Sequence, residues 1–203
     1  MAPVEYAGAI PILWGYAMPM EAIAIFVTGI AAVIAAFVGV TDQRRVVRQQ
    51  ITFEHIVQVE SDNDMIEARE NFIEFTTIPG KMSELAHPAT ISSKEAQYVT
   101  RFINNWENIS IGIQLNIIDF ELIKRYNKSA IINHWDSASQ FVSELRKTTG
   151  NRFYYHEFEE LARWMRDDKM PHRVRGDHFW VRHRWLIGVV VAVVSFILGA
   201  LMF

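Results

Sequence analysis

The chain has 203 residues, no cysteine and a formal net charge of −3 at pH 7. The absence of cysteine excludes disulfides, thiolate nucleophiles and zinc sites built on thiolates. The charge is unevenly distributed, because residues 49–168 carry 12 Lys and Arg against 19 Asp and Glu, while the other 8 basic residues flank this stretch. DNA and RNA would be repelled by such an acidic body, so a nucleic-acid-binding domain is not expected.

Two apolar segments, 22–40 and 185–203, each contain 19 residues and no ionisable side chain. A helix rises about 1.5 Å per residue, so either segment nearly crosses a hydrocarbon core of about 30 Å. The sequence therefore predicts two transmembrane helices. They flank residues 41–184, a stretch long enough for one domain with its own core.

The orientation of the two predicted spans follows from the flanking charges. Basic residues close to a span stay on the cytoplasmic side of a membrane, and residues 1–21 contain neither Lys nor Arg. We expect segment 1–21 and the C-terminus to face outward from a bacterial inner membrane, with domain 41–184 in the cytosol. The residues expected to fix topology or lie at the interface are Arg44, Arg45, Arg48, Arg173, Arg175, Arg182, Arg184 and Trp185.

Domain 41–184 shows helical periodicity and no alternating strand pattern. We expect the first span to continue as a helix until the polar run Ser61–Asp64, and a second helix to cover 65–78. A loop between Pro79-Gly80 and Pro88 follows. Residues Ser92–Glu95 match a capping box, which predicts the start of the next helix.

Three further amphipathic helices complete an all-α bundle. Asp119 is expected to begin the middle one of the three and Gly150 to end it, and the last covers about 153–168. The predicted core positions recur at three- and four-residue steps. They are Phe102, Trp106, Ile109 and Ile113, then Ile123, Tyr126, Ala130, His134, Ala138, Phe141 and Leu145, and finally Phe158, Leu161 and Met165.

Four short segments carry a resemblance to a known family: Trp106–Ile113, Ile118-Asp119, Ala130–Trp135 and Tyr155–Leu161. They are similar to the bacterial domain-of-unknown-function family 4760, in which a helical domain typically follows an N-terminal membrane span. The likeness covers about residues 42–168. The layout of two spans around a sensor-sized domain also resembles the two-span membrane effectors of phage-defence systems, retron-associated proteins among them.

The resemblance to two-span effectors implies an antiviral or stress-response protein that acts on the lipid bilayer when a cytosolic protein or ribonucleoprotein partner releases it. The alternative is a membrane-anchored helical adaptor that leaves the membrane intact. The sequence contains no Gly-rich phosphate loop and no nucleophile elbow, so an enzyme is the least supported class and no cofactor is expected.

Small residues recur on one side of each predicted span, as they do where transmembrane helices approach closely. They would either seal one hairpin within a chain or join several protomers, and both interpretations remain open. No ionisable group lies within either span, which argues against a transporter or proton pathway. The small or hydroxyl-bearing residues are Ala24, Thr28, Ala32, Ala36, Gly188, Ala192, Ser195 and Gly199.

Several polar residues have alternative interpretations. His134 lies on an apolar stripe, which favours a core or interface histidine over an acid–base catalyst. His156 and Glu160 are four residues apart and could share a metal, but two ligands do not close a site, so a solvated acidic helix face is favoured. Segment 172–185 mixes arginines, histidines and aromatics, which favours an interfacial membrane anchor over a ligand site.

Overall fold

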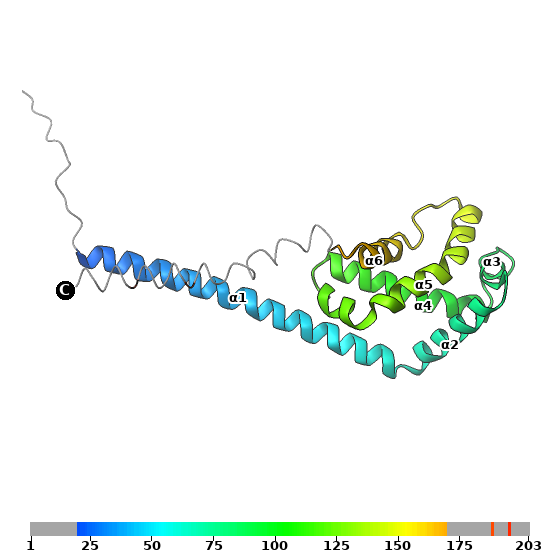
Figure 1. The fold of residues 1–203 in the computed structure, drawn as a ribbon, viewed down its shortest axis with the longest axis horizontal. Coiled ribbons are helices and arrows are strands. Elements are labelled where there is room, and N and C mark those ends of the chain that lie inside the picture. Colours follow the sequence, from blue (N-terminus) through cyan, green and yellow to red (C-terminus); the bar gives the residue numbers. More distant parts are fainter. Residues whose placement is uncertain (1–19, 170–187, 189–194, 196–203) are drawn as a thin grey trace, which may run out of the picture. The chain divides into compact units, whose positions relative to one another are not determined.

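The computed structural model describes residues 20–169 together with Gly188 and Ser195 (Figure 1). Every regular element in this part of the chain is an α-helix, which confirms the all-α class. The chain divides into two units, residues 1–39 with 184–203 and residues 40–183. The second unit contains the second half of helix α1 (Met20–Ser61) and helices α2 to α6, which lie within residues 63–167.

Helix α1 runs without interruption over Met20–Ser61, a length of 42 residues. The predicted continuation of the first apolar segment as a helix is therefore confirmed. The break at Ser61–Asp64 is confirmed too, because Asp62 is the N-cap of α2 (Asn63–Thr77). The Asp62 carboxylate accepts hydrogen bonds from the backbone N–H groups of Asp64, at 2.9 Å, and Met65, at 3.4 Å.

The part of α1 that corresponds to the first apolar segment exposes large side chains. Ile25 is 74% exposed and Val33 is 71% exposed. Over the residues that the structure describes, no helix is long and apolar enough to cross a membrane. The second apolar segment lies outside the described residues except for Gly188 and Ser195, as do the side chains of Ala22, Ile23 and Phe26 in the first.

The domain is built from five helices that follow α1 in the described chain (Figure 1). Helix α2 packs along α4, helices α4 and α5 both contact α6, and α3 contacts α5. Their bounds are α2 (Asn63–Thr77), α3 (Lys81–Leu85), α4 (Lys94–Gln114), α5 (Phe120–Thr149) and α6 (His156–Asp167).

Two local predictions need correction. The loop between Pro79-Gly80 and Pro88 contains the short helix α3, which follows Gly80 in the left-handed conformation at φ 77°. Helix α4 begins one residue later than a capping box would require. Its N-cap is Ser93, whose hydroxyl accepts from the Ala96 N–H at 3.1 Å. Glu95 instead pairs with Lys81 of α3 at 2.7 Å, so a contact distant in sequence replaces the local cap.

Helix α5 has the predicted ends, with Asp119 as N-cap and Gly150 at φ 69° as C-cap. Its buried face is only partly as predicted, because Tyr126 is 58% exposed whereas Ile131 and Trp135 are buried. Neighbouring faces of a 30-residue helix both satisfy three- and four-residue steps, so periodicity does not choose between them. The elements that cover the helix make that choice.

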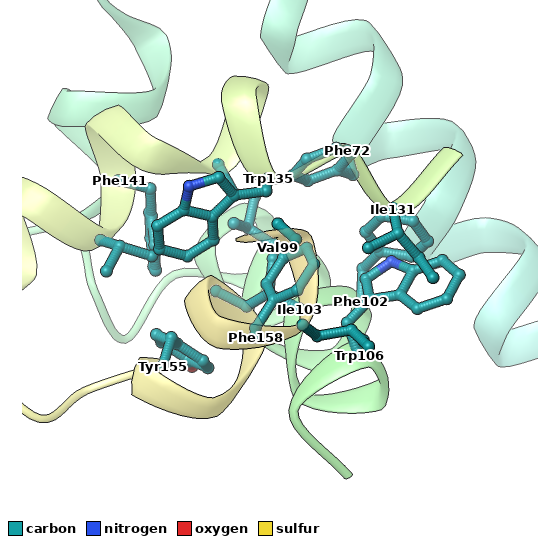
Figure 2. Packing of buried hydrophobic residues seen from close by; sticks show 14 of the residues in the cluster. Phe72, Val99, Phe102, Ile103, Trp106, Ile131, Trp135, Phe141, Tyr155 and Phe158 are labelled. Atoms are coloured by element: carbon teal, nitrogen blue, oxygen red, sulfur yellow. The ribbon is translucent and has the colours of Figure 1, made fainter. Parts of the chain in front are cut away.

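The core is rich in aromatic side chains contributed by α2, α4, α5 and α6 (Figure 2). Phe158 of α6 has no exposed surface. Its ring lies 5.3 Å from that of Trp135 in an edge-on arrangement and 6.2 Å from that of Trp106 in a stacked one. The predicted core residues Phe102, Trp106, Ile109, Ile113, Phe158, Leu161 and Met165 are all buried, which confirms the stripes on α4 and α6.

Candidate functional site

A concave site of about 630 Å³ lies between α1 and the turn that joins α4 to α5. Three arginines and three apolar side chains from α1, Val40 among them, line one side, and the turn supplies the other. We call this site the basic groove. Its defining residues are Arg44, Arg45, Val47, Arg48 and Ile51 from α1 and Leu115, Asn116 and Ile117 from the turn.

The turn of the basic groove has a conformation that its sequence requires. Asn116 has φ 60°, in the left-handed region that Asn tolerates better than most residues. The carbonyl of Gly112 accepts from the backbone N–H groups of Ile117, at 2.9 Å, and Ile118, at 3.1 Å. A Cβ on Gly112 would lie 2.7 Å from the Ile118 side chain. Ile118 thus packs inward over a glycine, while Leu115 and Ile117 are 61% and 48% exposed.

The wall of the basic groove is held by a nearly buried polar network. The hydroxyl of Thr52, fully buried on α1, accepts from the Asp119 N–H at 2.8 Å and donates to the Arg48 carbonyl at 2.7 Å. The Asp119 carboxylate caps α5 by accepting from the Leu122 N–H at 3.0 Å. It also lies 3.8 Å from Arg48 Nε, and the Arg48 guanidinium donates to Asn116. Arg48 therefore fastens the turn to α1.

The other two arginines of the basic groove have no such role. Arg44 and Arg45 are exposed and form no ion pair with a carboxylate of the described residues. Arg44 precedes Arg48 by four residues, a spacing at which like charges on a helix repel. Within the described part of the chain, the groove thus combines one arginine that is paired with a carboxylate and two that are not.

Replacing Asp119 by alanine should lower the free energy of unfolding by about 2 kcal/mol, because α5 loses its N-cap and Arg48 loses its carboxylate. Asp119→Asn keeps a capping oxygen and should cost about half as much. Urea denaturation of the protein in mild detergent, followed by circular dichroism, measures both values. Equal losses for the two variants would contradict the capping role.

His134 lies in an aromatic cluster away from the basic groove. Its ring is 4.9 Å from that of Phe102, 5.7 Å from that of Trp106 and 5.8 Å from that of Phe72. Burial, with a smaller contribution from the charge of Arg69, lowers the pKa of His134 to about 4. Its Nδ1 is buried without a hydrogen-bond partner. This is the environment expected for a core histidine and unlike that of a proton-transfer pair.

The neighbouring carboxylate does not complete an acid–base pair either, since Asp136 accepts a hydrogen bond from Arg166 of α6. A different carboxylate has a role that sequence reasoning missed. Glu107 of α4 accepts from the Phe158 N–H at 2.6 Å and the Glu157 N–H at 3.4 Å, and so caps the start of α6. Burial raises the pKa of Glu107 despite these two hydrogen bonds.

The remaining predicted candidates are not brought together. His156 lies against the ring of Phe153, and Glu160 pairs with Arg163. Among the described residues, no group of three or more His, Cys, Asp and Glu is placed to hold a metal ion. Segment 172–185, with the predicted interface residues Arg173, Arg175, Arg182, Arg184 and Trp185, lies outside the described residues.

The predicted helix-association residues are only partly described. Thr28, Ala32 and Ala36 are exposed on α1, and Ala24 is half-buried. The partly covered face of this helix follows a different stripe, comprising Ala24, Val27, Ala31, Ile34 and Val38. Gly188 and Ser195 have helical backbones and are exposed, whereas Ala192 and Gly199 lie outside the described residues.

Comparison with known proteins identifies a family. No curated protein and no solved structure matches the chain. A family model described as a domain of unknown function, DUF4760, matches residues 25–165. The match includes most of α1, all of α2 to α5 and most of α6, and therefore both the basic groove and the aromatic core. Since it covers more than half of the sequence, the chain belongs to the DUF4760 family.

Proposed function

We propose that the protein is a two-span effector of a bacterial antiviral or stress system. In this proposal segments 22–40 and 185–203 cross the inner membrane, both termini lie outside, and domain 41–184 is cytosolic. A cytosolic partner restrains the domain, and its release lets the spans perturb the membrane. The absence of ionisable side chains from two 19-residue apolar segments supports the spans.

The observation that carries the effector role is the continuity of α1 from the apolar segment into the domain. Thr52 has no exposed surface and Ile56 is 7% exposed, so the second half of the helix is fixed by buried side chains. A partner that alters the packing around these two residues would act on a helix whose backbone hydrogen bonds continue to residue 20. An adaptor that needs only a tether gains nothing from this continuity.

A specific observation also favours the alternative, an anchored adaptor. The α5–α6 loop exposes Phe153 by 62% and Tyr154 by 40%, and the preceding Gly150 and Arg152 line a cavity of about 510 Å³. Exposed aromatic residues beside a cavity are a common feature of protein interfaces. The adaptor predicts that exchanging both spans for unrelated ones preserves function, whereas Phe153→Ser abolishes it.

The effector is tested by the double variant Gly188→Leu with Gly199→Leu, which should abolish toxicity while membrane insertion persists. No described atom lies within 4 Å of a Cβ on Gly188, so bulk there does not clash with the described protomer. It would hinder close approach of another helix. The readout is membrane potential, followed with a voltage-sensitive dye in bacteria expressing the protein alone or with its neighbouring genes during phage challenge.

A matched control carries Val190→Leu and Val194→Leu, which add bulk at larger residues of the same segment. It should depolarise cells as the parent does. If the Gly188→Leu, Gly199→Leu variant is inserted in the membrane and still depolarises cells as strongly as the parent, the effector is contradicted. If the parent protein changes the membrane potential in neither setting, the adaptor is favoured.

A further inference from the structure

The basic groove presents apolar side chains to its surroundings as well as charge. Leu115 is 61% exposed, Ile117 48%, Val47 47% and Ile51 40%. All four line the same cavity as Arg44 and Arg45. Grouped exposed apolar residues on a domain mark a surface that something else covers. The groove therefore suits an occupant that is both anionic and apolar.

The position of the groove along α1 favours a lipid as this occupant. Val40 is the last residue of the apolar segment and lines the groove, and Arg44 follows it by one helical turn, about 6 Å along the axis. Leu115 and Ile117 line the same cavity and Asn116 between them accepts from Arg48, so the turn lies beside the stretch of α1 from Val40 to Arg48, about 12 Å long. If residues 22–40 cross the bilayer, this stretch lies at the level of the headgroups.

The charges of the groove select among lipids. A guanidinium binds the oxygens of a phosphate through paired hydrogen bonds. Arg48 is already placed against Asp119, so Arg44 and Arg45 provide two positive charges that have no carboxylate partner within the described part of the chain. A zwitterionic headgroup would bring a further cation to these arginines, whereas an anionic one brings only negative charge.

We propose that the basic groove binds the phosphate headgroup of one anionic phospholipid. Arg44 and Arg45 hold the phosphate, and Leu115 and Ile117 lie at the boundary between headgroups and acyl chains. This inference rests on the membrane location in the proposed function and is independent of any membrane-perturbing activity.

The test uses the full chain in detergent, with phosphatidylglycerol and phosphatidylcholine as probes and native mass spectrometry to count retained lipids. The parent should prefer phosphatidylglycerol. Arg44→Gln with Arg45→Gln should weaken this binding about thirtyfold, because a basic residue beside an anionic headgroup contributes about fivefold. Leu115→Ser with Ile117→Ser should weaken binding of both lipids, and because both side chains are exposed the domain should stay folded.

The matched control, Arg125→Gln with Arg163→Gln, removes the same charge from exposed positions on α5 and α6 and should change binding less than twofold. Equal weakening by the control and by the groove variant would overturn the inference, since binding would then follow net charge alone. So would displacement of the lipid by soluble glycerophosphoglycerol at equal concentration, which would indicate a site for a free anion.

The two proposals fail in different ways. An unchanged membrane potential with the parent protein in both settings, with lipid selectivity intact, would refute the effector and leave the groove in place. Extraction of the protein from membranes by carbonate would refute the spans, and binding by the groove would then be judged from co-sedimentation with phosphatidylglycerol vesicles. Vesicle binding that Arg44→Gln with Arg45→Gln leaves unchanged would refute the groove in that case as well.

Discussion

Replacing Phe158 by alanine is expected to lower the free energy of unfolding by about 4 kcal/mol. The ring has no exposed surface and packs between Trp106 and Trp135, so the substitution leaves a cavity bounded by large rigid rings that cannot close it. A domain of this size has a total stability of about 5–15 kcal/mol, so the variant would lose roughly a quarter or more of it. Urea denaturation in mild detergent, followed by near-ultraviolet circular dichroism, measures the change.

Phe153→Ala provides the matched control for Phe158→Ala. This residue lies five positions earlier in the chain and is 62% exposed, so its loss should change stability by no more than about 0.5 kcal/mol. A loss below about 1 kcal/mol for Phe158→Ala would show that the aromatic core can collapse around the vacated space. The core between α4, α5 and α6 would then be packed less tightly than the structure shows.

Acidification should destabilise the domain through His134, by about 3 kcal/mol between pH 6.5 and pH 4. The pKa of this histidine is 6.5 in the unfolded chain and about 4 in the folded one, so the unfolded state binds the proton more tightly across this window. Each pKa unit corresponds to about 1.4 kcal/mol. The full stability is present above pH 6.5 and decreases as the pH falls towards the folded-state pKa.

The variant His134→Gln removes this titration and should show a flatter dependence of stability on pH. Its Nδ1 has no hydrogen-bond partner, so the change breaks no bond at that atom. Glu107 acts with the opposite sign, because burial raises its pKa, and the contribution of His134 is therefore the difference between parent and variant. Identical dependences of stability on pH for the parent and His134→Gln would disprove the contribution of His134.

The helix boundaries that sequence could predict are those encoded locally. The side chains of Asp62 and Asp119 accept hydrogen bonds from backbone N–H groups two or three residues later, and Gly150 adopts a left-handed conformation that most other residues avoid. These signals need no knowledge of the tertiary structure. The start of α6 is different, because Glu107 caps it from 50 residues away, and no local pattern encodes such a contact.

The candidate site was predictable only in its charged half. Arg44, Arg45 and Arg48 stand out because they follow an apolar segment. The apolar half depends on the turn around Asn116, whose left-handed conformation and packing over Gly112 point Leu115 and Ile117 outward. One sequence signal could have drawn attention to this turn. An asparagine with a large apolar residue on each side stands just before a helix N-cap.

The hydrogen bond between Asp119 and Thr52 sets an order of events during synthesis. These residues are 67 positions apart, so at about 5–20 residues per second Thr52 is synthesised roughly 3–13 seconds before its partner. For that time the second half of α1 has no turn to pack against. A ribosome that stalls before residue 115 would therefore leave a nascent chain whose first helix displays Ile51 and Ile56 to chaperones and proteases.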